Sequence, residues 1–103
     1  FISIAGNSYK ATDATEQAAI ERIFKDTSRM GYVASKAIFG ETLGASEVLA
    51  VISALLCMEH GKVPGLSYLE EKHSADKADC CIVNSLFTGG NINSVLLKKV
   101  QEA

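Results

Sequence analysis

The stretch SKAIFGETLGA, residues 35–45, decides how this chain is built. It follows the short apolar run Tyr32-Val33-Ala34, which predicts a strand. It precedes a long apolar run, which predicts a helix. Gly40 and Gly44 interrupt the segment between them and predict a loop. The stretch therefore predicts a strand, a loop and a buried helix in succession.

The chain before this stretch predicts a strand and a helix. Residues 1–5 alternate apolar and polar side chains and end at the turn Gly6-Asn7. Asp13 is a predicted helix N-cap, with Glu16 as the acid three residues later. Apolar side chains then recur at helical spacing, which predicts a helix with one buried face that ends between Lys25 and Ser28.

The chain after this stretch predicts a helix that begins at Ser46 or Glu47. Apolar residues from Val48 to Met58 occupy nearly every side of it, so we expect this helix to be buried on all sides. Gly61 is a predicted C-cap. The rest of the chain predicts, in order, a surface loop over residues 66–79, a strand over 80–85, a tight turn over 88–91 and a strand over 95–100. The order βαβαββ predicts an α/β fold with a mixed sheet around a buried central helix.

Composition limits the function classes. The 103 residues form one domain at most, and 48% apolar with 21% charged residues is typical of a globular chain. A net charge of -2 with no basic cluster argues against nucleic-acid binding. The longest apolar helix has about 14 residues, too few to span a bilayer. No signal peptide precedes the first predicted strand. We therefore expect a cytoplasmic protein, and the start at Phe1 suggests a piece of a longer one.

The thiols and imidazoles predict no metal or cofactor site. Cys57, Cys80 and Cys81 have no metal-binding spacing, and we expect buried structural thiols. His60 ends a predicted helix and His73 lies in a predicted polar loop, so both are expected to be solvated.

Three segments, in the right order, resemble the C-terminal part of the β-ketoacyl synthases of the thiolase superfamily. Residues 35–45 resemble that family's Ser/Thr-Lys-x-x-x-Gly-His-x-x-Gly-Ala segment. Residues 3–7 and 12–16 resemble Asn-Ala-His-Gly-Thr followed by Asn-Asp-x-x-Glu. Residues 84–92 resemble Asn-Ser-Phe-Gly-Phe-Gly-Gly-Thr-Asn. The resemblance covers nearly the whole chain and implies the C-terminal portion of the thiolase-like layered fold over residues 1–103.

The resemblance also implies that the catalytic groups have been lost. The two catalytic histidines of the family fall on Ala5 and Glu41, while the family's lysine is kept as Lys36. The glutamate that pairs with this lysine falls on Ala50. The gating aromatic residue falls on Thr88, which makes the loop of Phe87, Thr88, Gly89 and Gly90 a substrate-channel candidate.

These losses imply a non-catalytic partner. In the family, the histidines promote decarboxylation of a malonyl unit and stabilise the enolate oxygen. Ala5 has no donor, and a Glu41 carboxylate would repel that oxygen. No cysteine is on a strand-to-helix elbow that would expose a nucleophile. The resemblance therefore implies a chain-length-factor-like subunit that forms a heterodimer with an active ketosynthase and meets acyl carrier protein through that complex.

Two alternatives stay open. A divergent malonyl-thioester decarboxylase or acyltransferase could use Lys36 and Glu41. A non-enzymatic relic could act as a binding module alone. Lys36 and Glu41 are more simply interpreted as an ion pair across the loop.

Overall fold

The computed structural model describes residues 1–6, 10–28, 30–40, 42–66, 78–86 and 91–100. Four strands form one mixed sheet in the order β2-β1-β3-β4. β1 (Ile2–Ser3) pairs in parallel with β2 (Tyr32–Val33) and with β3 (Cys80–Leu86). β4 (Ile92–Lys98) is antiparallel to β3 along its whole length. The predicted mixed sheet is therefore confirmed.

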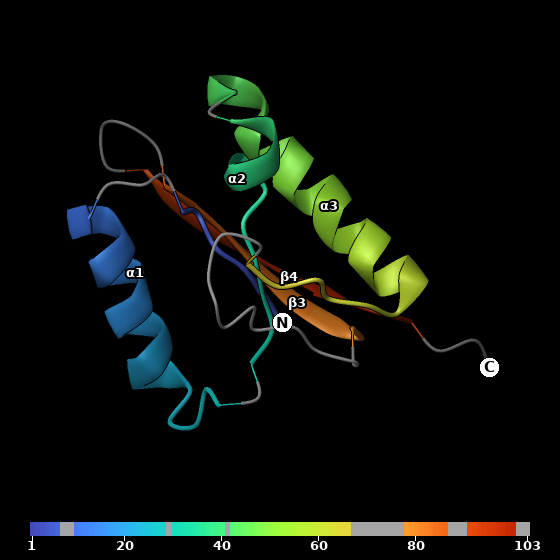
Figure 1. The fold of residues 1–103 in the computed structure, drawn as a ribbon, viewed down its shortest axis with the longest axis horizontal. Helices are drawn as coiled ribbons and strands as arrows, with labels where there is room; N and C mark the ends of the chain where they lie inside the picture. The colour runs from blue at the N-terminus through green and yellow to red at the C-terminus, as the bar shows by residue number, and fades with distance from the viewer. Residues whose placement is uncertain (7–9, 29, 41, 67–77, 87–90, 101–103) are drawn as a thin grey trace.

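The helices lie on the two faces of this sheet (Figure 1). α1 (Lys10–Ile23) covers one face and α3 (Ser46–His60) covers the other. Between β2 and α3 the chain forms a short helix, α2 (Lys36–Phe39), and a 3-10 turn, η1 (Leu43–Ala45). The result is a small three-layer α/β fold with the sheet in the middle.

The structure corrects the predicted order around residues 35–45. These residues were expected to form a loop, but the N–H groups of Ile38 and Phe39 donate to the Ser35 carbonyl, and the N–H of Gly40 donates to Lys36. These bonds make one helical turn, which ends at Gly40, where φ is 73°. The described elements therefore run β1, α1, β2, α2, η1, α3, β3, β4 rather than strictly βαβαββ.

Several predicted boundaries also move. α1 begins at Lys10 and ends at Ile23, so Asp13 is in its first turn and is not its N-cap. β4 begins at Ile92 rather than at Val95, because the antiparallel pairing with β3 extends to the pair Leu86–Ile92. Of the predicted loop over 66–79, the structure describes Leu66 and Ala78, which are buried, and Asp79, which is exposed.

One face of α3 forms part of the core. Ser46, Ala50, Ala54 and Met58 recur every four residues and are buried. Ala50, Ala54 and Met58 pack against Cys81 and Val83, which point to this side of β3. Small side chains at Ala50 and Ala54 let the helix backbone approach the sheet closely.

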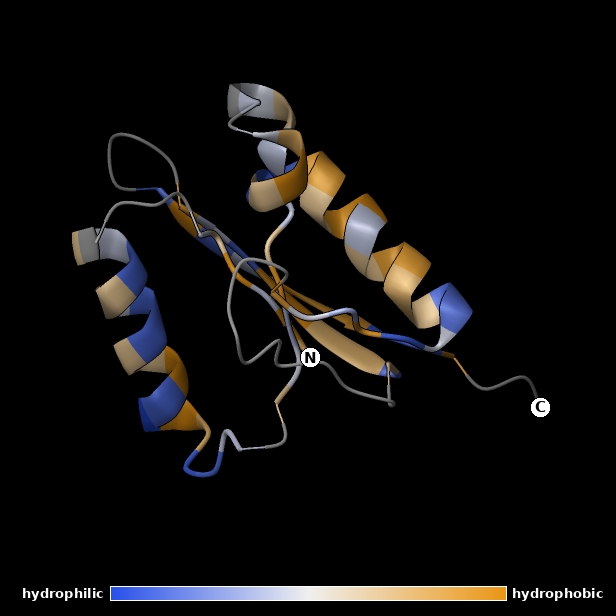
Figure 2. Cartoon of the chain, in the orientation of Figure 1, coloured by the Kyte–Doolittle hydropathy of each residue, from blue (hydrophilic) through white to orange (hydrophobic). Residues whose placement is uncertain are grey.

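The opposite face of α3 is exposed. Val48 is 60% exposed, and Ile52, Leu55 and Leu56 are each about half exposed, at 47–50%. The prediction of a helix buried on all sides is therefore wrong for this chain. The physical reason is the layer order, because α1 lies beyond the sheet and no described element covers the outer face of α3 (Figure 2).

Candidate functional site at the carboxyl edge of the parallel strands

The candidate positions lie along one edge of the sheet. β1, β2 and β3 are parallel, so their carboxyl ends meet at the same edge. Ala5 follows β1 and Lys36 follows β2. A Cβ placed on Gly6 would lie 3.7 Å from the Cβ of Ala34, which shows how closely the two segments approach. Ligands of open α/β sheets bind outside this kind of edge.

Glu16 holds the turn after β1 in place. Its side chain extends from the second turn of α1 and is nearly buried, at 9% exposure. The N–H of Ala5 donates to both carboxylate oxygens, Oε1 at 3.1 Å and Oε2 at 2.9 Å. The N–H of Gly6 donates to Oε1 at 3.5 Å. Glu16 was predicted as the acid of a capping box with Asp13, but its carboxylate instead accepts hydrogen bonds from the turn after β1. The sequence signal for this position was its spacing of four residues before the apolar Ile20, which places both on one face of the helix.

Few of the described side chains at the carboxyl edge can donate or accept a proton. Ala5 is 4% exposed, and its methyl group cannot donate a hydrogen bond. Lys36 is partly exposed and is the first residue of α2. Ala50 is buried between α3 and β3. Glu41 and the loop of Phe87, Thr88, Gly89 and Gly90 lie outside the described residues, as does His73.

Two serines near this edge were missed by sequence reasoning. Ser3 is fully buried and Ser85 is 7% exposed. Neither hydroxyl has a hydrogen-bond partner among the residues that the structure describes. Ser3 pairs with Val83, and Val83 and Ser85 lie on the same face of β3, so both serines belong to the side of the sheet that α3 covers. Strand alternation was the signal that could have found them. Buried hydroxyls of this kind destabilise a fold unless a partner satisfies them.

The three thiols differ in their surroundings. Burial raises the pKa of the Cys81 thiol to about 11, and burial also raises the pKa of Cys57. Cys57 is half-buried and Cys80 is exposed, so the prediction of buried thiols is confirmed only for Cys81 and is wrong for Cys80. It opens β3, where alternation points it away from Cys81. The nucleophilic form of cysteine is the thiolate, so Cys81 is poorly suited to act as a nucleophile.

Histidine is absent from the described part of the carboxyl edge. His60 is exposed at the last position of α3. The helix has 15 residues, so His60 lies about 20 Å from its N-terminal end. Among the described residues, no group of three or more His, Cys, Asp or Glu side chains is placed to hold a metal ion.

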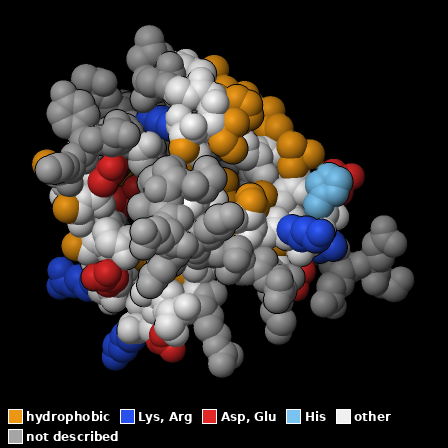
Figure 3. Space-filling model, viewed as in Figure 1, with side chains coloured by type: hydrophobic (Ala, Val, Ile, Leu, Met, Phe, Trp, Pro, Cys, Tyr) orange, Lys and Arg blue, Asp and Glu red, His pale blue; other side chains and the backbone are white. Residues whose placement is uncertain are grey.

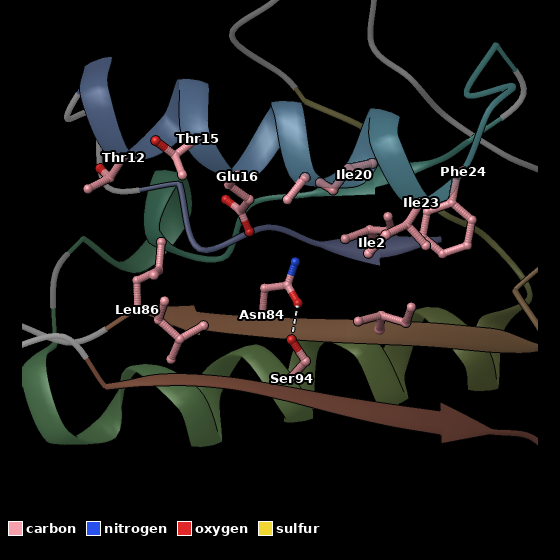
Figure 4. Close-up of a pocket in the computed structure, with 13 residues that line it drawn as sticks. Ile2, Thr12, Thr15, Glu16, Ile20, Ile23, Phe24, Asn84, Leu86 and Ser94 are labelled. Carbon is pink, nitrogen blue, oxygen red and sulfur yellow. Dashed lines mark hydrogen bonds between the residues drawn. The ribbon is translucent and has the colours of Figure 1, made fainter.

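An apolar cavity of about 500 Å³ lies between α1 and the sheet (Figure 4). Ile20, Ile23 and Phe24 of α1 form one wall, and the facing wall includes Ile2 and Leu86. Polar groups are few. The carboxylate of Glu16 faces the cavity, and Ser94 donates to the Asn84 side chain at 2.8 Å on the strand side. The lining fits an apolar group better than an ion.

The comparison with known protein families agrees with this geometry. The family described as "Beta-ketoacyl synthase, C-terminal domain" matches residues 1–70, which is most of the chain. The chain belongs to this family. The matched residues include β1, α1, β2 and α3, so they contain the Glu16-anchored turn and the Lys36 segment at the carboxyl edge.

Two curated relatives are longer than this chain. It is 28% identical over 110 residues to "3-oxoacyl-[acyl-carrier-protein] synthase 1" of Escherichia coli strain K12, and equally to the protein of that name in E. coli O6:H1. The alignment covers 96% of this chain and 27% of each relative, so the chain spans about a quarter of their length. No solved structure matched. In the part of the chain that the structure describes, no helix is long and apolar enough to cross a membrane.

Proposed function

We propose that this chain is a non-catalytic, ketosynthase-like subunit that pairs with an active β-ketoacyl synthase and helps to shape the acyl-chain tunnel, as chain-length factors do. The observation that carries the proposal is Ala5 at the carboxyl edge. Its backbone N–H is held by the nearly buried Glu16, while its side chain is a buried methyl group. The backbone scaffold of the edge is therefore kept where the resemblance expects a histidine, and the hydrogen-bond donor is gone.

The missing donor decides the chemistry. Decarboxylative condensation needs donors aimed at the oxygen that becomes negative, and removing one such donor costs about 100-fold or more in rate. Ala5 supplies none, and the sequence has a carboxylate, Glu41, where the second histidine is expected. The loss of both donors supports a subunit that depends on a partner for the reaction.

The likeness to a synthase that acts with acyl carrier protein supports the kind of partner. The E. coli relative is named for that carrier, and this chain corresponds to only 27% of its length. We propose that an active ketosynthase forms a heterodimer with this chain in the cytoplasm and that acyl carrier protein is met through the complex. The apolar cavity beside α1 supports contact with an alkyl chain, because its walls are mainly Ile, Leu and Phe side chains.

Malonyl-thioester turnover tests the non-catalytic assignment. The chain alone is expected to release no carbon dioxide from malonyl-acyl carrier protein above the background rate, because no donor stabilises the enolate. Lys36→Ala is the matched variant, and we expect it to behave like the unmodified chain. Turnover that disappears in Lys36→Ala would instead establish the decarboxylase or acyltransferase alternative and contradict the proposal.

A further inference from the structure

We draw no further inference here: the strongest candidate, the exposed apolar patch along the outer face of α3 (Figure 3), carries none because nothing in the part of the chain that the structure describes shows what covers it.

Discussion

At the scale of single residues, Glu16 is the side chain on which the site scaffold depends most. Glu16→Ala removes the acceptor for the Ala5 and Gly6 N–H groups and leaves buried donors unsatisfied. We expect a loss of about 1–3 kcal/mol in the free energy of unfolding, because such a loss is typical of an unsatisfied buried group. Urea denaturation followed by circular dichroism measures it.

Glu21→Ala is the matched control on the same helix. Glu21 is exposed and accepts a hydrogen bond from the Gln17 side chain one turn earlier, at 3.0 Å. Its loss should cost no more than about 0.5 kcal/mol. Equal losses in the two variants would contradict the role given to Glu16.

Cys81 gives a second prediction, based on pH. Its pKa is about 11 in the folded chain, above the ordinary value of 9.0, because burial disfavours the thiolate. The unfolded chain loses this proton first as pH rises, so the contribution of Cys81 to stability is complete below pH 9 and declines between about pH 9 and pH 11. Denaturation of the unmodified chain and of Cys81→Ala across this window measures the difference. We expect a shallower decline in Cys81→Ala, and identical slopes would contradict the assignment.

At the scale of elements, the end of α3 depends on Gly61. Its φ of 66° and ψ of 26° are left-handed, and its N–H donates to the Cys57 carbonyl. Gly61→Ala places a side chain in this conformation and should lower the free energy of unfolding by about 1–2 kcal/mol, measured by thermal denaturation. Gly44→Ala is the control, because Gly44 has no positive φ and open space around its Cβ position. A Gly44→Ala loss as large as that of Gly61→Ala would contradict this account.

The elements also show what the sequence could predict. Two features followed from local signals. Gly61 was predicted as a C-cap because a glycine follows an apolar helix, and the strand predicted over 80–85 from a β-rich run is observed as β3, Cys80–Leu86. The exposure of the outer face of α3 could not be predicted in this way. Apolar residues on every side of a helix predict that it is buried, but they do not show which element covers it. The Glu16 bond to Ala5 was also missed, since it joins α1 to the turn after β1 across 11 positions of sequence.

The site residues themselves stay predictions. The resemblance assigns Ala5 and Lys36 to the degenerate site, and the parallel pairing of β1 with β2 brings the segments that follow these strands to one edge of the sheet. The buried hydroxyls of Ser3 and Ser85, which have no hydrogen-bond partner among the described residues, could not be predicted from the sequence. Their burial depends on how α3 packs against the sheet. The roles predicted for Glu41 and for residues 87–90 stay predictions, because these residues lie outside the described part of the chain.

At the scale of the whole molecule, the chain keeps a scaffold of the ketosynthase family, and we propose that it has lost the reaction. The sheet, the Glu16-anchored turn and the small-residue face of α3 are all present, while the described carboxyl edge lacks a histidine. A scaffold of this kind is useful when another subunit supplies the missing groups. The central claim is therefore an association with an active ketosynthase.

The most direct measurement is the mass of the complex that co-purifies when this chain is co-expressed with an active β-ketoacyl synthase. Light scattering gives the mass, and quantitative amino-acid analysis gives the ratio of the two proteins. The account predicts a stable complex with equal numbers of each. Elution of the two proteins as separate species at micromolar concentration would contradict it.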